Sequence, residues 1–129
     1  MRILLDTQCW LWMQAEPHRL SARSRRLLTE AGNELLLSAA SAWEIAIKAV
    51  LGRLRLPEPV AEYVTSRMAR HGIRSVPIEQ AHALQVAQLP PHHRDPFDRI
   101  LIAQAQIEAL PILTSDRVFR AYDVKVMRA

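Results

Sequence analysis

Four acidic residues are placed where metal-dependent chemistry can use them. Asp6 follows the first apolar run of the chain, and Asp116 follows the apolar run that ends at Thr114. Glu44 and Asp98 each fall in the first turn of a predicted helix. Carboxylates held close together repel one another, so a fold that gathers them needs a compensating charge. Oxygen ligands of this kind suit Mg²⁺ or Mn²⁺, which can activate water and neutralise charge on a phosphoryl group.

The segment 93–105 predicts a helix whose first turn aims a carboxylate inward. Asp95 suits the N-cap and Pro96 suits the first helical position. Asp98 then heads an apolar stripe at helical spacing, formed by Leu101, Ile102, Ala105 and Ala109. A carboxylate on such a stripe costs several kcal/mol unless it is hydrogen-bonded, paired or metal-bound. The alternative is that Asp98 only assists Asp95 in capping the helix.

The rest of the chain alternates short apolar runs with helical patterns. Strands are expected at 3–5, 35–37, 74–78, 111–114 and 124–127, and helices at 10–16, 22–29, 42–51, 59–70, 79–89 and 96–109. This alternation predicts one α/β domain over 1–129, with helices on both faces of a mainly parallel sheet. Right-handed crossovers place the carboxyl ends of the strands at one edge, where chemistry usually sits. All four acids are expected to converge there.

Each acid can also be explained by a purely structural role. Asp6 could cap the first helix, and Asp116 could cap a turn. Ser41 and Glu44 match a capping box, and Glu44 with Lys48 matches an ion pair at i,i+4 spacing. Taken singly, these readings are at least as good as a functional one. The joint convergence of the four acids favours a site.

The composition of the chain indicates the kind of partner and the cellular compartment of such a site. Of the 129 residues, 50% are hydrophobic, and the net charge of +4 with a pI of about 10.0 favours a polyanionic partner such as nucleic acid. The single cysteine, Cys9, excludes an internal disulfide and is expected in the core or an interface. Asp6 interrupts any signal-peptide apolar region, and no run is long enough to span a membrane. We expect a cytoplasmic protein.

Histidine and tryptophan give weaker signals. His92 and His93 are adjacent, which is not a ligand spacing, so a solvated loop is favoured over a transition-metal site. Trp43 is assigned to the core. Trp10 and Trp12 are expected to divide between the core and a contact surface.

Four motifs in order carry a resemblance to a known family. They are Leu4-Leu5-Asp6-Thr7, the stretch Ser38 to Lys48 with Trp43-Glu44-Ile45-Ala46-Ile47-Lys48, the stretch His93 to Ala105 with Asp95-Pro96-Phe97-Asp98-Arg99, and Leu113-Thr114-Ser115-Asp116. Together they resemble PIN-domain proteins, specifically the VapC-type toxin ribonucleases of prokaryotic toxin–antitoxin modules. The resemblance covers nearly the whole chain. It implies a three-layer α/β/α PIN-like domain, with a sheet of four to five strands, that acts as a Mg²⁺- or Mn²⁺-dependent endoribonuclease.

The resemblance also implies roles for individual residues. The ligand positions map onto Asp6, Glu44, Asp98 and Asp116. Groups expected to support these ligands are Asp95, Thr7, Thr114 and Ser115. Lys48 and Arg99 are candidates to hold the RNA backbone, although both could equally be solvated. Gln8 departs from the pattern, since similar sequences often have His there, but it lies outside the acidic set.

The implied partners are an RNA substrate, a second copy of the chain in a homodimer, and a VapB-type antitoxin that covers the site. The segment Cys9 to Met13 is apolar all round a helix, so part of it must face away from the sheet. We expect this helix to form part of a groove for an apolar antitoxin helix, because an exposed patch with a tryptophan often marks a binding surface. No membrane contact is expected.

Three other functions share parts of this pattern. An acid-cluster phosphatase usually needs a second Asp two residues after the first, and that position is Gln8. A phospho-acceptor receiver domain needs an acidic doublet after its first strand, and Asp6 is followed by Thr7. A basic module that binds RNA or protein without catalysis remains open. Metal-dependent cleavage of RNA separates these readings.

Overall fold

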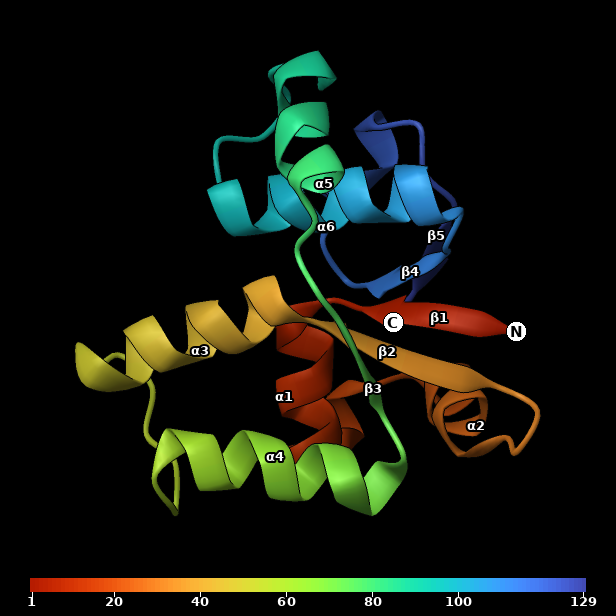
Figure 1. Cartoon of the computed structure of the whole chain (residues 1–129). Coiled ribbons are helices and arrows are strands. Elements are labelled where there is room, and N and C mark those ends of the chain that lie inside the picture. The colour runs from red at the N-terminus through yellow and green to blue at the C-terminus, as the bar shows by residue number, and fades with distance from the viewer.

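A computed structural model describes all residues from 1 to 129 and contains one five-stranded sheet (Figure 1). The strand order is β3-β2-β1-β4-β5, and every neighbouring pair is parallel. The strands are β1 (Arg2–Leu5), β2 (Glu34–Ser38), β3 (Arg74–Val76), β4 (Ile112–Thr114) and β5 (Val126–Arg128). The predicted mainly parallel sheet of four to five strands is confirmed.

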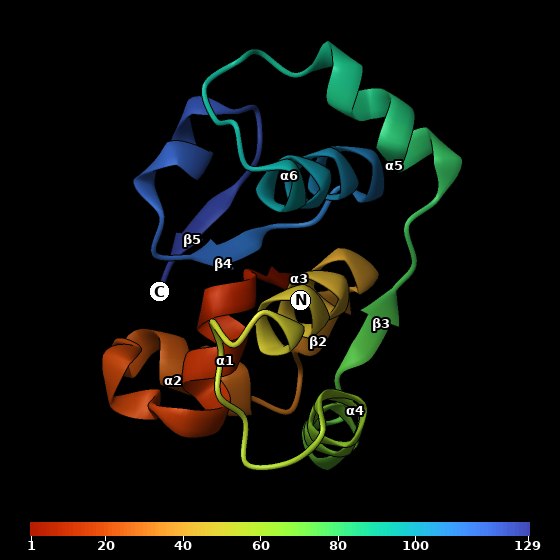
Figure 2. The same cartoon turned by 90° about the vertical axis from the view of Figure 1, so that its left-hand side faces the viewer.

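Helices cover both faces of this sheet, as Figures 1 and 2 show. The α-helices are α1 (Thr7–Ala15), α2 (Ala22–Thr29), α3 (Ala39–Val50), α4 (Val60–His71), α5 (Gln80–Gln85) and α6 (Pro96–Glu108). Short 3₁₀ turns are η1 (Pro17–Arg19), η2 (Val86–Gln88) and η3 (Arg117–Ala121). α1, α2 and α4 lie on one side of the sheet, and α5 and α6 lie on the other. No helix combines the length and the apolar character that a membrane crossing needs.

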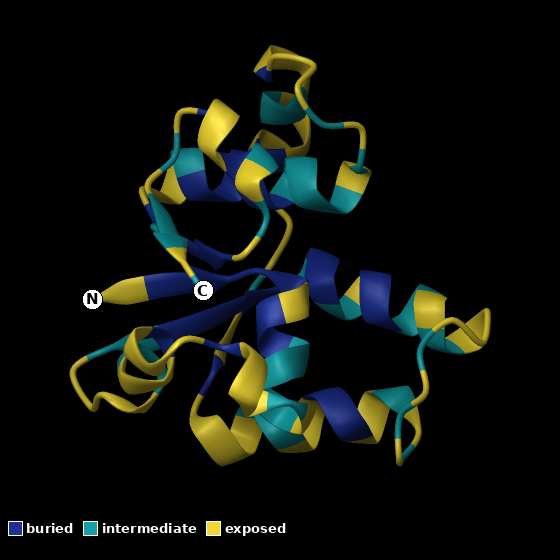
Figure 3. Cartoon of the chain, turned by 180° about the vertical axis from the view of Figure 1, so that it is seen from behind, coloured by how far each residue is buried: buried dark blue, intermediate teal, exposed yellow.

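The alternation of side chains along the strands builds two separate cores. Ile3 and Leu5 face the layer of α1 and α4, where Trp10 and Tyr63 pack edge to face. Leu4, between them, faces the opposite layer with α6. The three inner strands β2, β1 and β4 are therefore largely buried on their two faces, as Figure 3 shows for the dark blue ribbon of the sheet. The result is the expected three-layer α/β/α arrangement.

The predicted start of one helix and the predicted end of another are wrong. α3 begins at Ala39 rather than near Ala42, because the Ser38 hydroxyl accepts a hydrogen bond from the Ala40 N–H at 3.0 Å and caps the helix. Ser41 is therefore inside the helix and forms no capping box, and Glu44 lies in the second turn. The helix expected over 79–89 ends at Gln85 and continues only as the turn η2.

Candidate active site

The carboxyl ends of β1 and β4 bring the first and last acids together. The two strands pair directly, and the Asp6 N–H donates to the Leu113 carbonyl at 3.0 Å. The Thr114 hydroxyl donates to Asp6 Oδ2 at 2.8 Å and accepts from the Asp116 N–H at 3.0 Å. One buried hydroxyl thus fixes both acids, at the ends of neighbouring strands. Ser115 lies exposed between them and makes no side-chain hydrogen bond.

Glu44 reaches the same edge from α3. The Thr7 hydroxyl donates to the Ser41 hydroxyl at 2.8 Å, which ties the start of α1 to the helix that carries Glu44. The Thr7 hydroxyl therefore joins two elements, and a backbone hydrogen bond from Thr7 opposes the rise that burial causes in the pKa of Asp6. Lys48, one turn later, donates from Nζ to Glu44 Oε2 at 2.7 Å. The other oxygen of Glu44, Oε1, is buried and has no hydrogen-bond partner.

Asp98 enters from the first turn of α6. The carboxylate of Asp95 accepts hydrogen bonds from the N–H groups of Phe97 and Asp98, so Asp95 caps the helix as expected. Asp98 is turned inward, and its Oδ2 accepts from His93 Nε2 at 2.7 Å. The same His93 nitrogen lies 3.8 Å from Asp116 Oδ2. Placing His93 in a solvated loop was wrong, since its side chain is half-buried against two of the four acids.

These acids line one pocket of about 350 Å³ at the carboxyl edge of the sheet. Its walls include the four predicted acids, the capping Asp95, and also Thr7, Lys48 and Ser115. The opposite wall is formed by α1 and the turn after it, through Gln8, Leu11, Trp12 and Arg19. Sequence reasoning placed the acids at one edge, and all four line the same pocket there.

The electrostatics of the pocket reflect burial and crowding of like charge. Burial raises the pKa of Asp6 to about 6, the Thr114 hydrogen bond opposes that rise, and Glu44 and Asp116 add to it. Burial raises the pKa of Asp98 to about 7, reinforced by Asp6 and Asp95 and opposed by His93. A cation among these carboxylates would favour their charged forms and reverse both shifts.

The pocket fits a hard cation on its own chemistry. Its acidic side chains offer carboxylate oxygens, which are the ligand type that Mg²⁺ and Mn²⁺ prefer. The buried, unpartnered Oε1 of Glu44 is a costly group unless something binds it. His93, Asp98 and Asp116 also have ligand atoms within 4.8 Å of one another. The residues present can therefore hold a divalent ion.

The two basic residues expected at the RNA backbone are placed very differently. Lys48 lies in the pocket wall, and the hydrogen bond and charge of Glu44 raise the pKa of Lys48. Arg99 instead directs its guanidinium to the loop before α6. It donates to the carbonyls of Val86, Leu89, Pro90 and His93 and to the Tyr122 hydroxyl. Contact with RNA does not fit this placement, because Arg99 holds the loop that carries His93.

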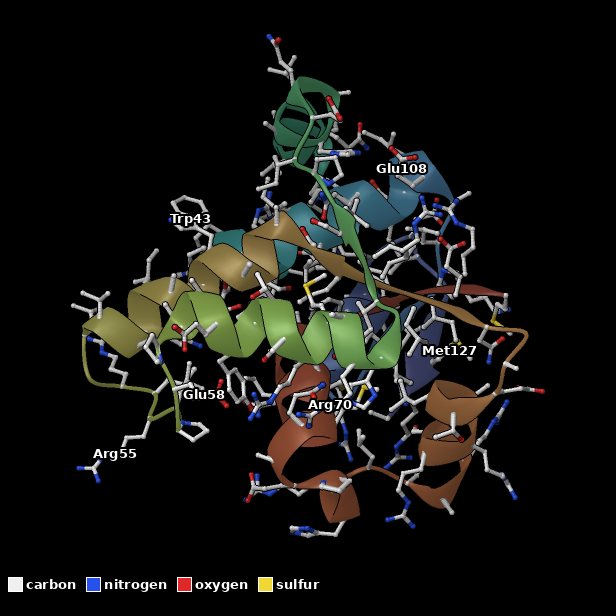
Figure 4. The ribbon with its side chains drawn as sticks, turned by 60° about the horizontal axis from the view of Figure 1, so that its bottom comes forward. Trp43, Arg55, Glu58, Arg70, Glu108 and Met127 are labelled. Carbon is white, nitrogen blue, oxygen red and sulfur yellow. The ribbon has the colours of Figure 1, made fainter.

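The tryptophans are also partly misassigned by sequence. Trp43 is 58% exposed and not in the core, and it packs edge to face on Phe97 with ring centroids 5.1 Å apart. Figure 4 shows Trp43 projecting from α3 away from the sheet. Trp10 is fully buried, so it cannot contact a partner, whereas Trp12 is half-buried in the pocket wall. Cys9 is buried in the core, as one of its two expected placements required.

Comparison with known proteins assigns the chain to a family. Residues 3–125 match the PIN domain. The chain belongs to the PIN-domain family. Ribonuclease VapC22 of Mycobacterium tuberculosis (strain ATCC 25618 / H37Rv) is 33% identical to this PIN-domain protein over 121 residues, which is 93% of this chain and 91% of that one. Ribonuclease VapC16 of the same organism is 46% identical over 76 residues, and the match spans about half of each chain (54%).

A solved structure shares the fold of this PIN domain. VapBC2 from Rickettsia felis, bound to a DNA fragment from the promoter, superposes with a TM-score of 0.75 and 12% identity, over 99% of this chain and 98% of that chain. At this identity the likeness concerns the fold alone. The fold and family expected from the four sequence motifs are both confirmed.

Sequence reasoning missed two parts of the PIN-domain pocket. His93 stands five residues before Asp98 in the same motif, and its place in the loop held by Arg99 could not be read from spacing. Arg19, whose guanidinium lies 5.5 Å from the ring centroid of Trp12, comes from a 3₁₀ turn that the helix periodicity did not mark.

Proposed function

We propose that this PIN-domain protein is a metal-dependent endoribonuclease, the toxin of a toxin–antitoxin pair, which hydrolyses RNA phosphodiesters. The observation that carries the proposal is the convergence of four carboxylates on one pocket, with Glu44 Oε1 buried and unpartnered. The names of its relatives, both ribonucleases, support the same activity.

The residues that would hold the ion are Asp6, Glu44, Asp98 and Asp116. Bound Mg²⁺ or Mn²⁺ supplies an activated water and neutralises charge that develops on the phosphoryl group. The protein contributes fixed ligands, because Thr114 orients Asp6 and His93 orients Asp98. Lys48 balances the charge of Glu44 at the pocket wall and is the remaining candidate to contact an RNA phosphate.

The proposed reaction is hydrolysis at phosphorus. The water oxygen bonds to phosphorus, the bond from phosphorus to the 3′-oxygen breaks, and the products carry a 5′-phosphate and a 3′-hydroxyl. A carboxylate accepts the proton of the water, and the leaving 3′-oxygen gains one.

The test is cleavage of mixed RNA with Mg²⁺, with Mn²⁺ and after chelation. The proposal expects cleavage only with a divalent ion, 5′-phosphate ends, and loss of at least 100-fold in Asp6→Asn. Glu62→Gln, an exposed acid on α4, is the matched control and should keep full activity. Cleavage that survives chelation, or that Asp6→Asn leaves intact, would contradict the proposal.

The proposal includes two protein partners. A VapB-type antitoxin would cover the pocket by its α1 wall, where Leu11 and Trp12 are half-buried. A second copy of the chain would dock through the exposed apolar side chains of α3 and its end, Trp43, Val50 and Leu51. The structural neighbours include complexes of VapBC proteins, which supports the antitoxin partner.

A further inference from the structure

Three arginines line a groove beside the active-site pocket. Arg117 and Arg120 lie on the turn η3, and Arg128 lies on the edge strand β5. All three are exposed, and together they line a groove of about 200 Å³. We call this feature the basic groove.

The basic groove and the active-site pocket share a wall. Ser115 and Asp116 line both of them. The two depressions therefore meet at the end of β4, where Thr114 fixes the backbone of Asp116. A strand held at the pocket therefore has the groove directly beside it.

The arginines of the basic groove are unpaired. By contrast, Arg2 and Arg74 share the Glu34 carboxylate as their ion-pair partner. No carboxylate lies within ion-pair distance of Arg117, Arg120 or Arg128. The one acid that lines the groove is Asp116, at its boundary with the pocket. The planar guanidinium groups are thus free to donate hydrogen bonds to an anion such as phosphate.

Positive charge continues from the groove onto α2. The Ser24 hydroxyl donates to the Arg128 carbonyl at 3.2 Å, so α2 packs beside β5, and Figure 2 shows the C-terminus between these two elements. Arg23, Arg25 and Arg26 on this helix are exposed and have no acidic partner. The basic surface therefore leads away from the active site across two elements.

We propose that the basic groove binds the RNA backbone next to the bond that is cut and directs the strand toward α2. This inference rests on the proposed ribonuclease function. The pocket itself offers an RNA strand only its bound cation and Lys48, so binding energy for the neighbouring phosphates must come from cations outside it. The basic groove supplies them at the rim of the pocket. Charged side chains on an edge strand can also serve only to block strand addition, and that role leaves RNA binding unchanged.

The experiment compares two triple variants of equal charge. The first is Arg117→Gln, Arg120→Gln and Arg128→Gln. The control is Arg53→Gln, Arg55→Gln and Arg70→Gln, three arginines that are also exposed and unpaired. Figure 4 shows Arg55 in the loop between α3 and α4, and Arg70 on α4. Equal melting temperatures of the two variants exclude a general loss of folding.

Binding of a single-stranded RNA is measured against salt in an Asp6→Asn background. Each phosphate contact contributes about 0.7 to the slope of log K against log salt, so the groove variant should lose about 2 from this slope, and the control nothing. With active protein at about 0.1 M salt, the KM of the groove variant should rise at least about tenfold with kcat unchanged, since uniform binding is lost.

Three outcomes would overturn the inference. If the two variants have equal salt slopes and equal KM values, the arginines do not bind RNA and only protect the sheet edge from strand addition. If the groove variant cleaves RNA normally but no longer binds the antitoxin, the groove is a surface for protein binding and not for RNA. If the unmodified protein neither binds nor cleaves RNA with any divalent ion, the proposed function itself fails, and the groove assignment fails with it.

Discussion

At the scale of single residues, the active site stores unfavourable charge that a cation would relieve. Asp6 and Asp98 have raised pKa values in the folded chain, so the folded state binds protons more tightly than the unfolded state does. That contribution to stability is complete below the ordinary carboxyl pKa near 4 and disappears as the pH rises through about 6 and about 7. The metal-free protein therefore becomes less stable over this range.

The raised pKa values of Asp6 and Asp98 predict how a metal ion stabilises the fold. Without metal, the free energy of unfolding should fall between about pH 4 and pH 7, by roughly 1.4 kcal/mol for each unit of pKa shift. Mg²⁺ or Mn²⁺ should raise the melting temperature more at pH 7 than at pH 5, because protonated carboxylates do not bind metal. Melting curves at both pH values check this, and a stabilisation that is independent of pH would contradict it.

His93 is the residue whose role geometry reveals best. Its Nε2–H donates to Asp98, while its own N–H donates to the Tyr122 hydroxyl at 2.7 Å and its carbonyl accepts from Arg99. The backbone of His93 is therefore held at both its N–H and its carbonyl, and its side chain fixes Asp98 Oδ2. Partners of this kind are worth about 10- to 100-fold in activity or metal affinity.

A pair of substitutions tests His93 as a positioning residue. His93→Ala should weaken Mn²⁺ binding by about 10- to 100-fold with little change in the KM for RNA. His93→Gln places an amide N–H near the position of Nε2 and should recover most of the loss. Calorimetry with Mn²⁺ gives the affinity, and His92→Ala is the control, since that side chain is exposed. Equal losses in the Ala and Gln variants would refute positioning through a hydrogen bond.

At the scale of elements, the start of α6 separates a capping acid from one that we propose as a metal ligand. Asp95 satisfies two helix N–H groups, and Asp98 faces the pocket. Asp95→Ala should cost about 1 kcal/mol of stability and retain more activity. Asp98→Asn should abolish cleavage, with an unchanged or higher melting temperature without metal. Denaturation and cleavage assays on both variants decide, and the reverse pattern would exchange their roles.

The elements were largely predictable because their signals are local. Short apolar runs, the proline at the first position of α6 and the glycine after α4 all lie where the structure begins or ends an element. What failed depended on tertiary contact. Ser38, not Ser41, caps α3, and Trp43 faces outward although its type suggested the core. The place of His93 required the loop held by Arg99, which no periodicity encodes.

At the scale of the whole molecule, acidic and apolar side chains meet in one pocket. Asp6, at the N-cap of α1, is one of its acids, while Leu11 and Trp12 of α1 are apolar residues of its wall. Trp10, on the same helix, is fully buried against Tyr63. An apolar helix of an antitoxin laid against Trp12 would bring its own polar side chains to the carboxylates, where an arginine would compete with metal.

The two tryptophans of α1 therefore give a sharp test of the antitoxin surface. After co-expression with the product of the adjacent reading frame, Trp12→Ala should weaken antitoxin binding by more than about 2 kcal/mol while the toxin stays folded, as expected for a buried aromatic contact at an interface. Trp10→Ala should instead lower the stability of the toxin by about 3–5 kcal/mol, because it opens a core cavity. Affinity and melting temperature, measured on both variants, distinguish the surface from the core. If Trp12→Ala binds the antitoxin as tightly as the parent does, the partner lies elsewhere, and the exposed side chains of α3 become the next surface to substitute.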